Sequence, residues 1–286
     1  MEERLRIAIQ NKGRLSEKSL DLIKTCGIHF GSDSRVLKEI ASNFPIEFLY
    51  VRDDDIPSYV AQGIADIGIV GKNEYDEQQI PLTIVRDLGF ARCRLSIATQ
   101  NDFKYEGLKS LNNKKIATSY PNILDKILKE NGVNASYVKV SGSVEITPAI
   151  GVADAICDLV STGTTLKMNG LKEVESIYTS SAVMIKNNNL PKNKSDILNR
   201  LLIRIDAVNR AKDYKYISFN LPEEHLSQVG ALVGSMKSPT VTKLYEDGWY
   251  SVQTVVAEDS FWDAFEKLKE IGAQGILVTK IEKMTE

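Results

Sequence analysis

Short apolar runs alternate with helical repeats in the first part of the chain, and no other feature restricts the fold as strongly. Leu5–Gln10, Ile46–Val51 and Asp66–Val70 are apolar runs of strand length. Between the first two runs, apolar residues recur at helical spacing from about Ser16 to Cys26. Strands that alternate with helices pack as a parallel sheet with both faces covered. The sequence therefore predicts an α/β fold.

A second α/β unit is expected to begin near Arg92, inserted between two halves of the first. It includes a helix over Asn122–Asn131, with Asn122 as its cap. After this unit, the polar segment Asn187–Ser195 is expected to be a loop, and a helix to follow over Asp196–Ala211. The strands of this part of the chain are expected at Leu95–Thr99, Lys115–Thr118, Tyr137–Val140, Ala155–Val160, Glu173–Ser180 and Ala182–Ile185.

Residues 214–286 follow the order β-α-β-β-α-β, which is that of ferredoxin-like domains. Two of the strands are joined through Asp247-Gly248, a strong hairpin signal. Asn220 and Glu223 have the spacing of a capping box, which predicts that a helix begins at Asn220. This order is common among small regulatory domains, but a fold alone does not assign a ligand.

These patterns divide the chain into two lobes and a C-terminal domain. The first lobe comprises residues 1–92 with 181–212, the second lobe 93–180, and the C-terminal domain 213–286. Two α/β lobes joined by a double crossover resemble type II periplasmic-binding proteins in architecture. We therefore expect a two-lobed α/β region followed by a ferredoxin-like (ACT-like) domain.

The charges of the chain nearly cancel, since 36 Lys and Arg against 38 Asp and Glu leave a net charge of −2. Such a chain lacks the broad basic field that non-specific nucleic-acid binding needs. No stretch approaches the roughly 18 apolar residues of a membrane helix, and the N-terminus has no secretory pattern. The sequence predicts a cytoplasmic enzyme or ligand-binding protein, without nucleic-acid or membrane partners.

Histidine and cysteine are scarce. His29 and His225 are the two histidines, and the three cysteines lie far apart in the sequence. A zinc site would need more such ligands at close spacing. Any catalysis must therefore rest mainly on carboxylates, hydroxyls, basic side chains and backbone amides.

The segment after Asp158 is the sharpest signal for a ligand. An apolar strand ends there, and a helix begins over Thr164–Met168. Free N–H groups at a helix start bind anions, and Gly163 lets the backbone approach a phosphate closely. The surrounding hydroxyls, more than one cap needs, belong to Ser161, Thr162, Thr164 and Thr165. The pattern predicts a phosphate site; a capped helix without a ligand is the alternative.

Three carboxylates accompany this loop: Glu145, Asp154 and Asp158. Carboxylates suit ribose hydroxyls, or a bridging Mg²⁺, which prefers oxygen ligands and substrate phosphates. For Asp154 and Asp158, a solvated turn and a strand end without a ligand are equally compatible with the sequence.

Charged residues also follow the first two strands of the chain. Lys12 and Arg14 lie on a glycine turn after the first strand, and Arg52 and Asp53 follow the second. Open α/β sheets bind ligands at the carboxyl ends of their strands, so contacts with a polyphosphate are predicted. Solvated loop charge is the alternative. Arg92, near the crossing between the lobes, is expected to face the same cleft.

At five places the sequence resembles the ATP phosphoribosyltransferase family. The most specific is Glu145–Leu166, which resembles the phosphoribosyl-pyrophosphate segment of that family without a departure from its pattern. The resemblance covers essentially the whole chain, and the C-terminal domain is similar to the regulatory domain of the family's long form. The other four places are Asn11-Lys-Gly-Arg-Leu15, Val51-Arg-Asp-Asp-Asp-Ile56, Asp66-Ile-Gly-Ile-Val-Gly71 and Arg92-Cys-Arg-Leu-Ser-Ile97.

The resemblance implies the first step of histidine biosynthesis. In this reaction N1 of the ATP adenine displaces pyrophosphate from C1 of phosphoribosyl pyrophosphate, which gives phosphoribosyl-ATP. No covalent protein nucleophile is expected, and catalytic residues stay unassigned. Mg²⁺ is expected to be held mainly by the substrate phosphates, with its protein ligands unknown.

Site residues follow from the resemblance position by position. Ser161–Thr165 would hold the 5-phosphate, and Asp154 with Asp158 the ribose hydroxyls. Glu145 would lie near the same substrate. The wall that faces ATP or pyrophosphate would comprise Lys12, Arg14, Arg52, Asp53 and Arg92.

The resemblance also implies regulation and assembly. AMP would compete at the catalytic cleft, and homodimers would assemble to homohexamers. Histidine would bind the C-terminal domain as a feedback inhibitor, at Asn220, Ser238, Thr240 and Ala273.

Two other functions are compatible with parts of the sequence. A cytosolic solute-binding or sensor module would share the two lobes, but it would not need the phosphate loop. A phosphoribosyltransferase that acts on another base would share the loop, but the four matches outside it argue against this.

Overall fold

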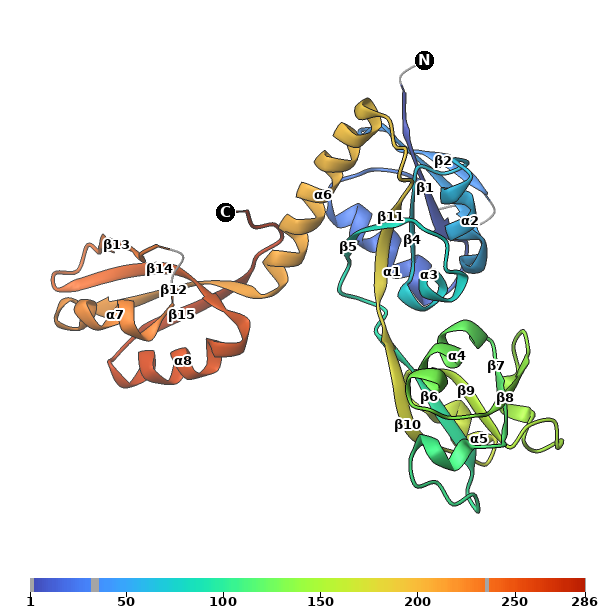
Figure 1. Cartoon of the computed structure of the whole chain (residues 1–286). Coiled ribbons are helices and arrows are strands. Elements are labelled where there is room, and N and C mark those ends of the chain that lie inside the picture. The colour runs from blue at the N-terminus through green and yellow to red at the C-terminus, as the bar shows by residue number, and fades with distance from the viewer. Residues whose placement is uncertain (1–2, 32–35, 235–236, 286) are drawn as a thin grey trace. The chain divides into compact units, whose positions relative to one another are not determined.

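The structure is a computed structural model that describes residues 3–31, 36–234 and 237–285. Its contacts divide the chain into two compact units, Met1–Lys24 with Ile28–Leu198, and Thr25–Gly27 with Asn199–Glu286. Two of the three sheets belong to the first unit and the third sheet to the second (Figure 1). No helix in the described ranges is long and apolar enough to span a membrane.

The first sheet has six strands. They are β1 (Leu5–Gln10), β2 (Lys38–Ile40), β3 (Ile46–Val51), β4 (Ile67–Gly71), β5 (Thr83–Asp87) and β11 (Ala182–Lys186). Their order is β2-β3-β1-β4-β11-β5, and β1 is parallel to both β3 and β4. The carboxyl ends of these three strands therefore meet at one edge. The helices that follow them are α1 (Arg14–Thr25), α2 (Ile56–Ala61) and α3 (Lys72–Gln78).

Strand β1 is buried on both of its faces, which explains its unbroken apolar run. Ala8 packs with Ile56 and Val60 of α2 on one face. Ile7 and Ile9 alternate with it, point to the other face and are fully buried.

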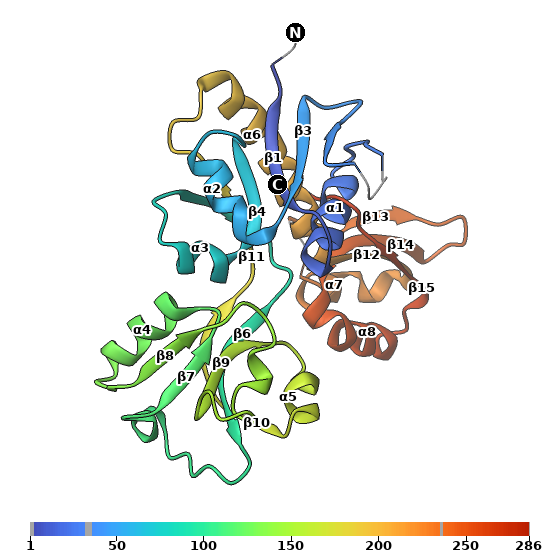
Figure 2. The ribbon, with the colours of Figure 1, turned by 90° about the vertical axis from the view of Figure 1, so that its right-hand side faces the viewer.

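The second sheet has five strands, which are β6 (Cys93–Gln100), β7 (Lys115–Thr118), β8 (Ser136–Lys139), β9 (Ala155–Val160) and β10 (Leu171–Ser180). Their order is β10-β6-β9-β7-β8. Helix α4 (Pro121–Glu130) packs on the face that carries Leu95 and Ile97. Helix α5 (Thr164–Met168) packs on the opposite face through Leu166 (Figure 2).

Two short segments join the first and second sheets. Residues 88–92 lead from β5 to β6, and Ser181 leads back from β10 to β11. Backbone bonds of 2.9 Å tie the segments together, from Leu88 N to Ala182 O and from Ala182 N to Phe90 O. We call these residues the crossing. The predicted two-lobed α/β region with a double crossover is confirmed.

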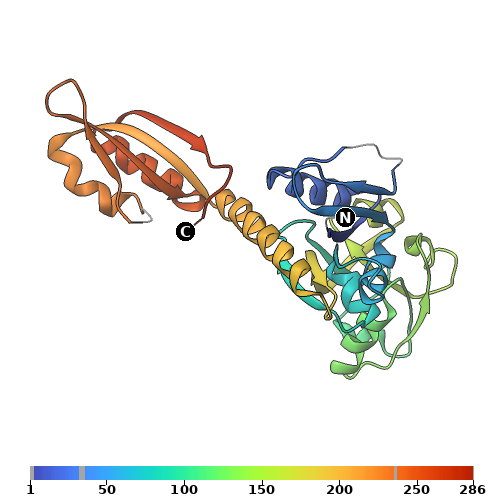
Figure 3. The ribbon, with the colours of Figure 1, turned by 90° about the horizontal axis from the view of Figure 1, so that it is seen from above.

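The third sheet follows α6 (Lys192–Lys212), one unbroken helix of 21 residues that leads into β12 (Tyr214–Pro222) (Figure 3). The other strands are β13 (Thr240–Lys243), β14 (Trp249–Ala257) and β15 (Gln274–Lys280). Every pairing in the order β13-β14-β12-β15 is antiparallel. Helices α7 (Leu226–Leu232) and α8 (Phe261–Glu270) pack on one face of this sheet. The predicted ferredoxin-like order is confirmed.

The capping box predicted at Asn220 is wrong. Asn220 lies inside β12, where Ile217, Phe219 and Leu221 are buried in alternation and carry the strand on to Pro222. A 3-10 turn at Glu223–His225 then leads into α7. The alternation of buried residues thus prevails over a polar residue with cap spacing.

Other predicted boundaries change for local reasons. Helix α4 begins at Pro121 after Tyr120, so Asn122 lies in the first turn and is not the cap; proline is favoured at that first position. Helix α6 begins at Lys192, inside the segment expected to be a loop. Strands β2 and β5 and helix α3 were not predicted.

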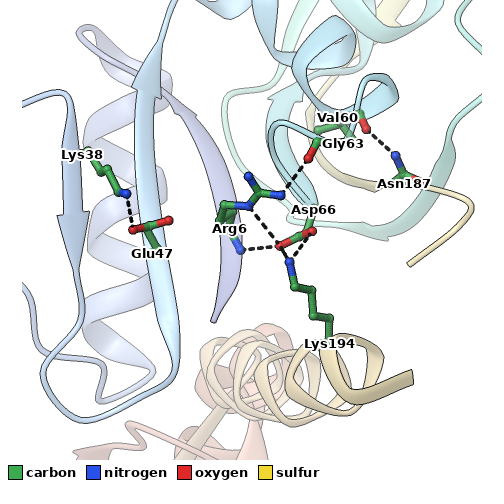
Figure 4. A network of polar contacts seen from close by, with 8 residues as sticks. All are labelled: Arg6, Lys38, Glu47, Val60, Gly63, Asp66, Asn187 and Lys194. Atoms are coloured by element: carbon green, nitrogen blue, oxygen red, sulfur yellow. Dashed lines mark hydrogen bonds and ion pairs between the residues drawn. The ribbon is translucent and has the colours of Figure 1, made fainter. Parts of the chain in front are cut away.

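A buried carboxylate joins the start of α6 to the first sheet (Figure 4). Asp66 accepts bonds from Lys194 Nζ at 2.8 and 2.9 Å and from the Arg6 backbone N–H at 2.8 Å. The side chains of Asp66 and Lys194 are only 8% and 12% exposed. Removing the Asp66 carboxylate would leave the buried Lys194 charge without this partner.

We therefore expect Asp66→Asn to lower the free energy of unfolding of the first unit by about 3 kcal/mol. The matched control is Asp125→Asn, because Asp125 pairs with Lys129 on an exposed helix surface. That change should cost below about 0.5 kcal/mol. Urea unfolding, monitored by circular dichroism, measures both free energies of unfolding. Equal decreases for the two variants would show that the buried pair contributes no more than a surface pair.

Candidate phosphate-binding cleft

The loop after β9 has the geometry of an anion site. Gly163 precedes α5 with φ of +76°, in the left-handed region that favours glycine, and no side chain caps the helix start. The hydroxyl oxygens of Thr162 and Thr164 lie 3.1 Å apart. The exposed hydroxyl residues of the loop are Ser161, Thr162, Thr164 and Thr165. Helix N–H groups and hydroxyls together present hydrogen-bond donors suited to a phosphate.

Arg94 of β6 holds the start of this loop. Its Nη1 donates to the Ser161 carbonyl oxygen at 3.2 Å, and its Nη2 donates to Glu173 Oε2 at 2.6 Å. Ser96 Oγ donates to the other Glu173 oxygen at 2.8 Å. The Arg94 guanidinium lowers the pKa of the Glu173 carboxyl. The loop is thereby tied to the two neighbouring strands, β6 and β10.

Two carboxylates meet beside the loop. Asp158 lies on β9 and accepts a bond from the Leu159 N–H at 2.8 Å. Burial is the main cause that raises the pKa of Asp158 to about 6, and the negative charge of Glu145 adds to the rise. Glu145 lies in the 3-10 turn Val144–Ile146. A ligand that brings hydroxyl donors or a cation would relieve this repulsion.

Asp154 lies at the other end of the same strand. It precedes β9, whereas the loop follows it, so about 23 Å separates Asp154 from Ser161 at ~3.3 Å per residue. Its Oδ2 accepts a bond from the Lys115 N–H at 2.9 Å, and Lys114 Nζ lies 3.5 Å from Oδ1. The structure brings Glu145 and Asp158 together but leaves Asp154 apart from them.

The charged residues of the first lobe lie at the edge where β1, β3 and β4 end. Lys12 follows β1 and lines a cavity of about 440 Å³ with Tyr50 and Glu39. Arg14 is the exposed first residue of α1. Lys72 comes directly after β4, and Lys12 comes two residues after β1. This shared edge is the position at which parallel sheets bind ligands.

Arg52 and Asp53 follow β3 at the same edge. The Arg52 guanidinium makes two parallel bonds to Asp54, from Nε at 2.9 Å and from Nη2 at 2.7 Å. Asp53 Oδ1 accepts a bond from the Asp54 N–H at 3.1 Å within a 3-10 turn. This pair holds Arg52 at the edge, and its exposure leaves it accessible to a ligand.

A cavity of about 540 Å³ lies at the crossing. Arg92 and Lys72 line it together with Ser161, the first residue of the loop. Basic side chains and the first residue of the loop thus line one cavity. Sequence reasoning missed Lys72, although its place directly after β4 is a usable signal.

In the C-terminal domain, the predicted positions divide between the two faces of the third sheet. Asn220 lies between buried neighbours on β12, so it faces away from the helices, and it pairs with Gln274. Ala273 is buried in the core on the helix side. Thr240 begins the edge strand β13, two strands from Asn220, and Ser238 precedes it, exposed. The sheet brings Asn220 close to Ala273, but it sets Thr240 further away.

No group of three or more His, Cys, Asp or Glu side chains arranged to hold a metal ion occurs within residues 3–31, 36–234 and 237–285.

Comparisons with known proteins agree over nearly the whole chain. Residues 52–207 match the family described as ATP phosphoribosyltransferase, and residues 211–283 match the HisG C-terminal domain. A protein from Cytophaga hutchinsonii named ATP phosphoribosyltransferase is 53% identical over 280 residues, which cover 98% of each chain. One from Bacteroides fragilis with the same name is 52% identical, over 98% of this chain and 99% of its own.

A solved structure supports the same relationship for the two-lobed region. A chain of the ATP phosphoribosyl transferase (HisG:HisZ) complex from Thermotoga maritima superposes with a TM-score of 0.58 at 28% identity. The match covers 71% of this chain and 98% of that one. This protein therefore belongs to the ATP phosphoribosyltransferase family, in the long form that carries the C-terminal domain.

Proposed function

We propose that this protein transfers the phosphoribosyl group of phosphoribosyl pyrophosphate to N1 of ATP and releases pyrophosphate, the first step of histidine biosynthesis. One observation carries the proposal within this family: the donor-rich loop Ser161–Thr165 directly follows a strand that carries the half-buried carboxylate of Asp158. The loop suits a 5-phosphate, and the carboxylate suits the hydroxyls of the attached ribose.

The reaction forms one bond and breaks one. N1 of adenine attacks C1 of the ribose, the bond from C1 to the pyrophosphate oxygen breaks, and its electron pair leaves with pyrophosphate. Positive charge develops on the ribose ring as this bond breaks. The loop holds the ring by its 5-phosphate, while Asp158 and Glu145 accept bonds from its hydroxyls and place negative charge beside it. Lys12, Arg14, Arg52, Asp53 and Arg92 form the wall toward ATP and the leaving pyrophosphate.

A divalent metal, here proposed to be Mg²⁺, accompanies the substrate. When bound to the pyrophosphate it neutralises charge on the leaving group. Asp158 and Glu145 would supply oxygen donors from this chain, and phosphate oxygens would complete the ligand set.

The domain boundaries proposed for this activity follow the sequence. Residues 1–92 with 181–212 and residues 93–180 form the two catalytic lobes, and residues 213–286 form a regulatory domain. Histidine binds that domain near Asn220 and Ala273, with Ser238 and Thr240 nearby, and AMP competes in the cleft. We further propose a cytoplasmic enzyme that forms homodimers and assembles to homohexamers.

Pyrophosphate release from phosphoribosyl pyrophosphate tests the proposal. We expect release that depends on ATP and Mg²⁺, with formation of phosphoribosyl-ATP in equal amount. Free bases and other nucleotides replace ATP as controls. Release at the same rate with another base, or none with ATP, would contradict the proposed reaction.

Histidine is expected to suppress this turnover, because the regulatory domain is present in the chain. The measurement is the initial rate at increasing histidine, with histidinol as a control that lacks the carboxylate. A rate indifferent to histidine would leave the reaction intact but contradict the proposed regulation.

A further inference from the structure

A glutamate of one catalytic lobe caps a helix of the other. Glu77 lies on α3, which follows β4 of the first sheet, and its carboxylate reaches the start of α4 on the second sheet. Glu77 Oε1 and Oε2 accept bonds from the Asn122 N–H at 3.0 and 3.1 Å, and Oε2 accepts one from the Ile123 N–H at 3.0 Å. Asn122 Nδ2 donates in return to the Glu77 carbonyl oxygen at 2.8 Å.

Helix α4 has no side-chain cap of its own. Its cap residue, Tyr120, makes no side-chain bond to the helix start, and the first residue, Pro121, has no N–H. The next two N–H groups therefore need an acceptor, and Glu77 supplies it. Glu77 is 8% exposed, and burial raises the pKa of its carboxyl, while the two backbone N–H groups oppose that rise.

A second set of bonds joins the same two elements. Tyr120 OH donates to Glu74 Oε1 at 3.0 Å and accepts a bond from Asn73 Nδ2 at 3.2 Å. Asn73 is held in turn by Ser180, at the end of β10, through bonds of 2.8 and 3.0 Å. The polar residues of α3, from Asn73 to Glu77, thus form hydrogen bonds with the second lobe.

The helix start that Glu77 caps adjoins the proposed ribose site. Strand β7, which leads into α4, pairs in parallel with β9, and Thr118 lies opposite Cys157, the neighbour of Asp158. Tyr120 N–H donates to Thr118 Oγ1 at 2.9 Å, which fixes the turn between β7 and α4. A displacement of this turn would therefore be transmitted to the strand that carries Asp158.

We propose that Glu77 is a positioning residue, which sets the two catalytic lobes relative to each other by capping α4 from the opposite lobe. The proposal rests on the proposed function, since it assigns Glu77 the task of holding the loop of one lobe at the correct distance from the basic edge of the other. Glu77 does not touch substrate. If the lobes separated, the start of α4 would lose its cap, so the arrangement in which Glu77 contacts α4 is favoured.

Amide hydrogen exchange and steady-state kinetics of Glu77→Gln and Glu77→Ala test this role. We expect faster exchange at Asn122 and Ile123 and also at Leu88 and Ala182, whose amides bond across the crossing. We expect kcat/KM to fall between about tenfold and about a hundredfold at a temperature where the variants remain folded, because small displacements of reacting groups are costly. Glu77→Ala is the second variant, because it removes the carboxylate without placing an amide group at the helix start.

Glu130→Gln is the control, because Glu130 is an exposed acid at the other end of α4. It should leave exchange and kinetics as in the wild type. Faster exchange at α4 with unchanged crossing amides and kinetics would overturn the proposal and leave Glu77 a local cap. Unchanged exchange at α4 would overturn it as well. If the wild type shows no ATP-dependent turnover, the proposed reaction fails, while the crossing amides still decide whether Glu77 positions the lobes.

Discussion

Asp158→Asn is expected to stabilise the protein and to abolish most of its activity. The folded pKa of Asp158 is about 6, above its ordinary value of 3.8, so the folded protein disfavours the charged form. This group therefore favours folding at low pH, and that contribution is lost as pH rises from about 4 through about 6. Above that window Asn removes the cost of burying the charge, which is about 3 kcal/mol. The gain should vanish below pH 4.

The same change should lower kcat/KM by about a hundredfold, because it removes a negative charge beside the cation that develops on the ribose. Urea unfolding at pH 4 and pH 8, together with turnover at pH 8, measures both effects. Asp154→Asn is the matched comparison, since Asp154 belongs to the same sequence segment but lies at the other end of β9. It should keep nearly wild-type turnover. A greater loss for Asp154→Asn than for Asp158→Asn would contradict the site.

Elements with a strong local pattern begin and end where the sequence predicts. Strands β1, β3, β7 and β9 and helix α5 keep their predicted bounds, because each strand carries its buried residues in a short local run and the glycine loop marks the helix start. Helix α3 was missed for the opposite reason. Its buried residues are polar, Asn73 and Glu77, and their partners come from the second lobe. No periodicity within α3 reveals them.

The candidate site likewise has residues that the sequence predicts together and residues that only the fold brings together. The loop Ser161–Thr165 is contiguous in sequence, so its donors could be predicted together. Asp154 and Asp158 are four residues apart, which on a strand is about 13 Å, and the sequence does not show that Asp154 precedes the strand whereas Asp158 lies within it. Lys72 and Arg92 meet Ser161 at one cavity only because the chain crosses twice between the sheets. Such contacts require the three-dimensional fold.

Thr162→Val is expected to lower kcat/KM for phosphoribosyl pyrophosphate by between about 10-fold and about 100-fold. Valine keeps the shape of threonine but removes a hydroxyl that we propose donates to the 5-phosphate. A hydrogen bond to a charged group contributes about 1.5–3 kcal/mol, and each 1.4 kcal/mol corresponds to roughly tenfold in rate. Thr162 is exposed, so the free energy of unfolding should change by less than about 0.5 kcal/mol.

Thr279→Val controls for the chemical change itself, because Thr279 is an exposed threonine on β15 of the third sheet. Its kinetics should match the wild type. The Thr162→Val change should raise the KM for phosphoribosyl pyrophosphate and leave the KM for ATP nearly unchanged. We expect this difference because the loop is proposed to contact only the first substrate. A rise in the KM for ATP alone would place the nucleotide, and not the 5-phosphate, at the start of α5. Equal effects of the two valine variants would remove the loop from the binding site altogether.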